Sequence, residues 1–274
     1  MPDQMIAAGG VTLGVSDDGA GIPVVLLHGL TASRRYVVMG SKALQRAGHR
    51  VVAYDARGHG ASSPAPTPDA YGYEELTADL AAVLDALGIE RAVLAGASMG
   101  AHTLLRLALD APERVAAVAV ITPGYDPVGV DDPARLARWD ALSDALRHGG
   151  IDAFAEAFGG QRLPEPWRAT VTTVMRQRLA LHEHLDAVAD ALHATPRSRP
   201  FPDLHALEEI ECPAVVVASR DEADPGHPLA LGEAYAELLG QGRLVVEAPG
   251  ESPLAWQGGR LSKVIAELAA RADL

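Results

Sequence analysis

Short apolar runs alternate with stretches of helical spacing along much of this chain, and this alternation constrains the fold more than any other feature. A strand that is apolar throughout is typical of burial on both faces, and an intervening helix allows consecutive strands to pair in parallel. The alternation therefore predicts a doubly wound α/β sheet with ligands at the carboxyl ends of its strands. The apolar runs lie at 24–27, 51–54, 92–95, 115–121, 214–218 and 244–247, and the helical stretches at 41–47, 74–87, 99–109, 229–239 and 261–272.

The interval 122–211 departs from this alternation. It shows helical periodicity at 134–146, 151–158, 167–181 and 184–192, without a clear strand. Prolines punctuate the interval, as expected for short helices joined by turns. We interpret it as a helical cap inserted into an α/β core that comprises residues 1–121 and 212–274.

The pentapeptide Gly96-Ala97-Ser98-Met99-Gly100 joins an apolar run to a helical stretch. Turning the chain from strand into helix within one residue leaves that residue strained and exposed, which requires neighbours with little or no side chain. Gly96 and Gly100 meet this requirement. The pattern predicts that Ser98 is a nucleophile at the carboxyl end of a strand.

Composition and charge exclude several classes of function. The formal net charge of −13 argues against binding nucleic acid or an anionic membrane, and no apolar run is long enough to span a bilayer. The single cysteine, Cys212, excludes an intrachain disulfide and a thiolate metal site. Neither HExxH nor a glycine-rich phosphate loop occurs, so no metal or cofactor is predicted. We expect a cytoplasmic protein whose partner is a small-molecule substrate.

Three motifs together resemble the α/β-hydrolase superfamily. They are His28-Gly29 after a strand, the segment DARGHGAS at 55–62 after the next strand, and the Ser98 pentapeptide. The resemblance implies hydrolysis of an ester, lactone, amide, epoxide or carbon-halogen bond, and some members of the superfamily catalyse non-hydrolytic reactions. It also implies that the backbone amides of Leu30 and Met99 form an oxyanion hole. His28 is expected to fix its loop.

The resemblance implies the chain order Ser, acid, His for a catalytic triad. The segment after the run at 214–218 contains two candidates for the acid, Asp221 and Asp224, of which the spacing to Pro228 favours Asp224. After the last strand, where the superfamily has its histidine, this chain has Glu251. The usual triad is therefore incomplete at that position.

Three explanations for the missing histidine remain open. In the first, Glu251 is the base, its pKa raised by burial and by a nearby carboxylate such as Asp224. In the second, a histidine from elsewhere is recruited, with His227 the best candidate. In the third, the chain is a non-hydrolytic relative or binds a ligand. The other histidines considered are His102, expected to pack beneath the loop, and His182 and His184, expected to be solvated on a helix.

We take the first explanation as the working hypothesis. Ser98 then attacks the carbonyl of a small, uncharged ester or lactone, while Glu251 and Asp224 manage the protons. Arg34 and Arg35 follow the oxyanion loop and are expected at a solvated helix start, where contact with a substrate carboxylate is the alternative role.

Overall fold

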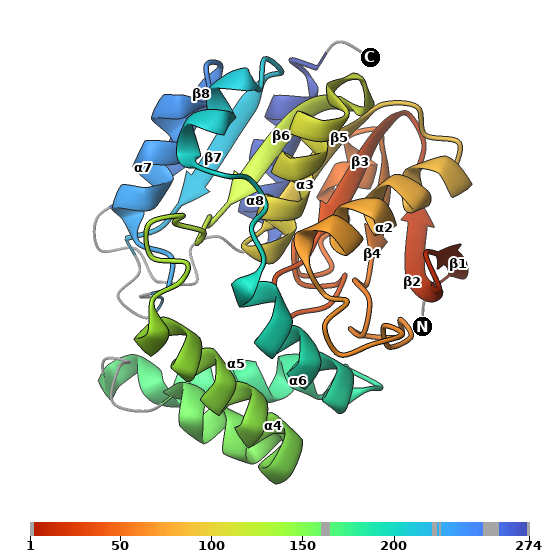
Figure 1. Ribbon diagram of the computed structural model, residues 1–274. Helices are drawn as coiled ribbons and strands as arrows, with labels where there is room; N and C mark the ends of the chain where they lie inside the picture. The colour runs from red at the N-terminus through yellow and green to blue at the C-terminus, as the bar shows by residue number, and fades with distance from the viewer. Residues whose placement is uncertain (1–2, 160–164, 221–223, 225, 249–257, 273–274) are drawn as a thin grey trace.

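A computed structural model describes residues 3–159, 165–220, 224, 226–248 and 258–272 of the 274-residue chain. Within these residues a single twisted sheet is covered by helices on both faces (Figure 1). The strands are β1 (Gln4–Ala8), β2 (Val11–Asp18), β3 (Ile22–Leu27), β4 (His49–Tyr54), β5 (Ala92–Ala97), β6 (Val115–Ile121), β7 (Ala214–Ala218) and β8 (Gly242–Val246). The α-helices are α1 (Ala43–Arg46), α2 (Tyr73–Ala86), α3 (Met99–Asp110), α4 (Pro133–Gly159), α5 (Glu165–Leu179), α6 (Leu185–Ala194), α7 (Leu229–Leu238) and α8 (Gly258–Ala269), and the 3₁₀ turns are η1 (Pro112–Arg114), η2 (Thr195–Arg197) and η3 (Leu204–Glu209).

The strand order is β1-β2-β4-β3-β5-β6-β7-β8, and every pair from β4 to β8 is parallel. The predicted doubly wound α/β fold is confirmed. From β3 the chain passes first to β4 on one side and then to β5 on the other, so the loops that follow the neighbouring strands β3 and β5 diverge. Ligands bind at such a topological switch point in doubly wound sheets.

The sequence alternation does not predict the antiparallel hairpin of β1 and β2 at the sheet edge. Gly9 and Gly10 form its two-residue turn with φ angles of 48° and 86°, a conformation that glycine adopts without strain. The hairpin extends the sheet because β2 also pairs antiparallel with β4.

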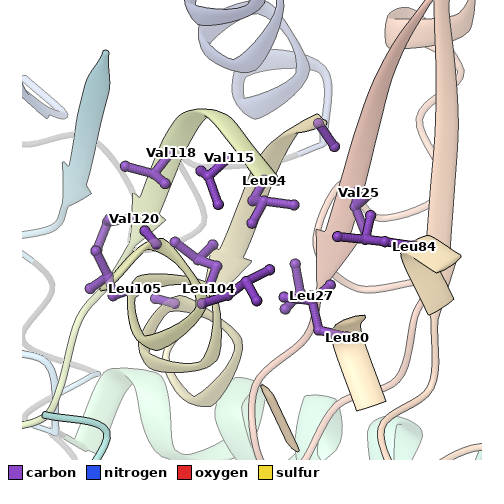
Figure 2. Packing of buried hydrophobic residues seen from close by; sticks show 14 of the residues in the cluster. Val25, Leu27, Leu80, Leu84, Leu94, Leu104, Leu105, Val115, Val118 and Val120 are labelled. Atoms are coloured by element: carbon purple, nitrogen blue, oxygen red, sulfur yellow. The ribbon is translucent and has the colours of Figure 1, made fainter. Parts of the chain in front are cut away.

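The two faces of the sheet bury alternate residues of the same strands, as expected for strands covered on both sides. One face packs against α2, α3 and α7, and Figure 2 shows Leu27 and Leu94 meeting Leu80 and Leu104 there. The other face, which includes Val24 and Val215, packs against α1 and α8. Full burial of an aliphatic side chain of this size contributes about 1.5–3 kcal/mol, so this two-sided core fixes the strands that position the site.

Helices α4, α5 and α6 lie between β6 and β7 in the chain and stand apart from the helices that flank the sheet (Figure 1). They share a separate apolar cluster that includes Leu146, Phe154 and Leu192, and α4 is interrupted at Gly150, where φ is 68°. The segment after α6 returns to the sheet, because Phe201 and Leu207 pack into the main core. No helix in the described part of the chain has the length and apolar character needed to cross a bilayer.

Candidate active site

Ser98 occupies the single residue between β5 and α3 and has a φ of 49° and a ψ of −111°. Such a backbone conformation costs a non-glycine residue roughly 1–3 kcal/mol. A side chain at Gly96 would overlap the backbone of Gly100, and a side chain at Gly100 would overlap the carbonyl of Leu27. The small residues therefore allow a strained turn that places Ser98, half-buried, at the carboxyl end of the sheet.

The strand register brings three loops to the same edge of the sheet. Ala97 of β5 pairs with Ile121 of β6, which pairs in turn with Val217 of β7. Ser98 N–H donates to the Ile121 carbonyl at 2.9 Å, and Thr122 N–H donates to the Val217 carbonyl at 2.7 Å. Residues that follow β7 therefore start level with Ser98, although they are more than a hundred positions away in the sequence.

His227 joins Ser98 to Asp224. Its Nε2 lies 2.8 Å from Ser98 Oγ, and its Nδ1 lies 2.8 Å from both carboxylate oxygens of Asp224. Because an ionised carboxylate only accepts hydrogen bonds, the proton of a neutral imidazole is on Nδ1 and Nε2 accepts from the Ser98 hydroxyl. This is the geometry in which a histidine can take a serine proton while an acid holds its tautomer.

The electrostatics of the pair favour charge separation. Burial by itself lowers the pKa of His227, but the adjacent Asp224 carboxylate more than offsets this, and the pKa of His227 is raised above its ordinary value. Burial by itself raises the pKa of Asp224, but the His227 imidazole, the charge of Arg178 and a hydrogen bond from the Gly226 backbone together outweigh that effect, so its pKa is lowered. Asp224 is thus ionised at neutral pH and able to stabilise an imidazolium at His227.

Two backbone donors lie beside Ser98. Gly29 is in contact with the serine turn, since a Cβ built on it would lie 3.5 Å from Ser98 Cβ, and Leu30 follows it directly. Met99 is the first residue of α3, where amides have no acceptor within the helix. In the described part of the chain, no acceptor is recorded for the amide of Leu30 or of Met99. Both amides are therefore available to a ligand, as an oxyanion hole requires.

Two residues outside the proposed triad, Gly124 and Glu247, contact residues that follow β7. A Cβ on Gly124 would lie 2.8 Å from His227 Cδ2, so the absence of a side chain there allows the imidazole to approach the end of β6. The buried carboxylate of Glu247, just after β8, accepts hydrogen bonds from the Ser219 hydroxyl at 3.1 Å and from the Arg220 amide. Glu247 was not among the predicted site residues, and its signal in the sequence is a single acidic residue at the end of an apolar strand.

Asp221 and Glu251 lie outside the described residues, so the role predicted for Glu251 stays a prediction. His102 is buried with both ring nitrogens occupied: Nε2 accepts from the amides of Gly124 and Tyr125 at 3.1 Å, and Nδ1 donates to the hydroxyl of Tyr73 at 2.9 Å. His102 thus packs beneath the residues that follow β6, in agreement with its predicted packing role.

The expectation that His182 is solvated on a helix is wrong. His182 follows α5 in a loop and is buried, its Nδ1 accepting from the Gly60 amide at 2.8 Å, and burial lowers its pKa to about 3. His184 is exposed at the start of α6, consistent with the prediction for that residue. His28 fixes its loop as expected, because Nε2 accepts from Ala56 N–H at 2.9 Å.

The expectation of a solvated Arg34 is also wrong. The side chain of Arg34 is only 10% exposed, and it pairs with the fully buried carboxylate of Asp55. The same carboxylate accepts from the Arg34 amide at 2.8 Å. Arg34 therefore braces the DARGHGAS segment against the turn after β3. Among the described residues, no group of three or more His, Cys, Asp or Glu side chains is arranged to hold a metal ion.

Comparison with known proteins agrees with the fold. Residues 22–211 match the model of the alpha/beta hydrolase fold family. The chain is 31% identical over 255 residues to a 2-hydroxy-6-oxononadienedioate/2-hydroxy-6-oxononatrienedioate hydrolase of Paraburkholderia phymatum, covering 87% of this chain and 86% of that protein. It is 38% identical over 119 residues to a protein of Mycobacterium phage D29 named as a non-heme haloperoxidase, an alignment that spans 43% of this chain and 42% of that protein.

A solved structure extends the likeness over nearly the whole chain. A thermophilic esterase from Thermogutta terrifontis superposes with a TM-score of 0.77 at 26% identity, covering 96% of each chain. The strand order, the strained serine turn at the end of β5 and the matching family model lead to one conclusion. This chain belongs to the α/β-hydrolase fold family.

Proposed function

We propose that this protein is a serine hydrolase that cleaves a small ester or lactone, with Ser98 as nucleophile, His227 as general base and Asp224 as the acid that orients it. The observation that carries the proposal is the pair of 2.8 Å contacts at His227, one to Ser98 Oγ and the other to Asp224. A base aimed at the serine favours covalent catalysis over proton transfer directly to a ligand.

The reaction proceeds in two acyl-transfer steps. Ser98 Oγ attacks the carbonyl carbon as its proton passes to His227 Nε2, and the amides of Leu30 and Met99 stabilise the resulting oxyanion. Collapse of this tetrahedral intermediate breaks the bond to the leaving alkoxide oxygen, which takes the proton from His227. A water molecule then attacks the acyl-serine, giving its proton to His227, and the acid is released as Ser98 recovers its proton.

The helical segment from 122 to 211 is proposed to act as a cap on a core of residues 1–121 and 212–274. Support comes from α5, whose Met175 Sδ accepts a hydrogen bond from Thr31 Oγ1 at 3.8 Å, beside the Leu30 amide. Leu30 itself packs against the apolar cluster of α4, α5 and α6. A cap in this position excludes water from the reacting carbonyl, which strengthens the electrostatic interactions within the site.

The names of the similar proteins support hydrolysis. One relative is named as a hydrolase and the superposed structure as an esterase. The ester and the lactone share the same reacting group, an acyl carbon bonded to an oxygen leaving group, so the proposed chemistry applies to both.

The test is covalent labelling with a fluorophosphonate together with hydrolysis of p-nitrophenyl acetate. We expect one labelled peptide containing Ser98, and Ser98→Ala is expected to lose both labelling and esterase activity. Ser63→Ala is the matched control, since Ser63 Oγ accepts from the Thr12 amide at 2.9 Å in a solvent-exposed hydrogen bond. Labelling elsewhere, or full esterase activity in Ser98→Ala, would contradict the proposal.

A further inference from the structure

One cation of the helical segment faces the proposed triad. Arg178 lies in the last turn of α5, three residues after Met175, and residues with this spacing share a face of a helix. Met175 contacts Thr31, the residue after Leu30, as described above. Helix α5 therefore places the Arg178 side chain toward the loop that contains the Leu30 amide.

The guanidinium of Arg178 has a cation–π partner but no hydrogen-bond partner among the described residues. Its Cζ lies over the ring of Tyr36, 5.1 Å from the ring centroid, in a cation–π contact. Its Nε is buried, and no hydrogen bond or ion pair to the guanidinium is recorded in the part of the chain that the structure describes. A buried donor left in this way is destabilising unless a ligand accepts its hydrogen bond.

The positive charge of Arg178 affects the pKa values of two residues of the proposed triad. After burial and the mutual contact of Asp224 and His227, Arg178 is the next influence on the pKa of each residue, and it lowers both values. Burial lowers the pKa of Arg178 and the charge of Asp224 offsets part of this, but both carboxylate oxygens of Asp224 contact His227 Nδ1, and no ion pair joins Asp224 to the guanidinium among the described residues. Of the two arginines that follow the loop containing Leu30, Arg34 pairs with Asp55 and Arg35 is exposed.

We propose that Arg178 binds a carboxylate of the substrate, so that the compound cleaved at Ser98 is a half-ester or a carboxyl-substituted lactone. This inference rests on the proposed function and replaces the uncharged substrate that the sequence predicts. The planar fork of an arginine matches the two oxygens of a carboxylate, and the contact with the Tyr36 ring helps to hold the guanidinium in place. A bound carboxylate also compensates a half-buried positive charge that has no such partner in the described residues.

The experiment measures ligand binding rather than turnover, in the Ser98→Ala background. Isothermal titration calorimetry compares monomethyl glutarate and monomethyl adipate with their dimethyl esters. It also includes 4-acetoxybutanoate and its methyl ester, which place the carboxylate on the alcohol side. We expect at least one carboxylate probe to bind about tenfold to a hundredfold more tightly than its neutral partner, the range of a hydrogen bond to a charged group.

The added substitution Arg178→Gln is expected to remove this preference and to leave affinity for the neutral diesters within about twofold. Arg178→Lys keeps the charge without the fork and is expected to be intermediate. Arg176→Gln is the matched control, because Arg176 pairs with Asp152 at 2.6 Å on the exposed part of the same helix. Circular dichroism and thermal melting verify folding of each variant.

Two results would overturn the inference. One is equal binding of charged and neutral probes by the Ser98→Ala protein, a comparison that needs no change at Arg178. The other is an equal loss of affinity for both probe classes in Arg178→Gln, which indicates a structural role. If the proposed function fails instead, the Ser98→Ala protein keeps its preference for carboxylate probes while the wild-type protein cleaves none of the esters.

Discussion

Replacing Asp224 by Asn tests how the proposed triad sets the pH dependence of hydrolysis. His227 acts as a base only when it is neutral, so kcat/KM rises with pH through the pKa of His227. Because that pKa is raised above the ordinary value of 6.5, we expect the acidic limb of the wild-type profile to have its midpoint above pH 6.5. The Asp224→Asn substitution removes the carboxylate that raises the pKa, while burial, which lowers it, remains.

The size of the shift follows from the geometry. Two unit charges about 4 Å apart interact by about 4 kcal/mol at an effective dielectric constant of about 20. The side chains of Asp224 and His227 are 43% and 23% exposed, so solvent screens much of this energy. We take about 1–2 kcal/mol for the contribution of Asp224 and expect the midpoint of the acidic limb to fall to lower pH.

The substitution also lowers the plateau of the profile. An asparagine amide can donate to Nδ1 and stabilise the tautomer with its proton on Nε2, which cannot accept from Ser98. The corresponding change in a well-studied serine protease lowers kcat about 10⁴-fold, and we expect a loss of about 10³–10⁴-fold.

The assay is hydrolysis of p-nitrophenyl acetate between pH 5 and pH 9. Asp140→Asn is the matched control, because Asp140 contacts His193 Nδ1 at 2.8 Å on the surface of the helical segment. It is expected to leave both the midpoint and the plateau unchanged. An Asp224→Asn profile with the wild-type midpoint and plateau would refute the assignment of Asp224 and the electrostatic reasoning with it.

Two further predictions concern the framework of the site, and both are checked by urea denaturation. Gly100→Ala forces a methyl group against the Leu27 carbonyl and is expected to lower the free energy of unfolding by about 1–3 kcal/mol, whereas Gly259→Ala, in open space on α8, leaves it unchanged or raises it by up to about 1 kcal/mol. Arg57→Met leaves the buried carboxylate of Asp79, which lies 2.8 Å from Arg57, without its ion-pair partner, and is expected to lower the free energy of unfolding by about 3–5 kcal/mol. The double variant with Asp79→Leu is expected to recover most of this stability. A loss below about 1 kcal/mol in Gly100→Ala or Arg57→Met would contradict these accounts.

The central sheet was predictable because its strands are buried on both faces and read as unbroken apolar runs. The hairpin of β1 and β2 was not predicted, since β1 alternates buried and exposed residues and gives a weaker signal in apolar content. The pair Gly9-Gly10 between two alternating segments is the signal that could have identified it.

The candidate site was only partly predictable. The serine turn follows from local sequence, because its glycines and its position between strand and helix are adjacent in the chain. The contact between His227 and Ser98 depends instead on register: β5, β6 and β7 must end at the same level before a loop after β7 can reach the serine. The spacing expected from the superfamily predicted Glu251 instead, at the position after the last strand.

Burial of single polar residues was the hardest property to predict. His182 lies beside Glu183 and has the local sequence of a solvated segment, yet it is buried because Gly60, more than a hundred positions earlier, donates to its ring. The partial burial of Arg178 was also hard to predict, because its polar neighbours Arg176 and Gln177 are typical of an exposed helix face. In both cases a partner distant in sequence, rather than the local pattern, decides the environment.

The most direct test of the proposed triad compares His227→Gln with Glu251→Gln in one assay, the second-order rate constant for inactivation by a fluorophosphonate. A neutral glutamine cannot take the Ser98 proton, so His227→Gln is expected to lower this constant by about 10²–10⁴-fold, whereas Glu251→Gln stays within about threefold of wild type. The reverse result, with Glu251 required and His227 dispensable, would contradict the assignment of His227 as the base.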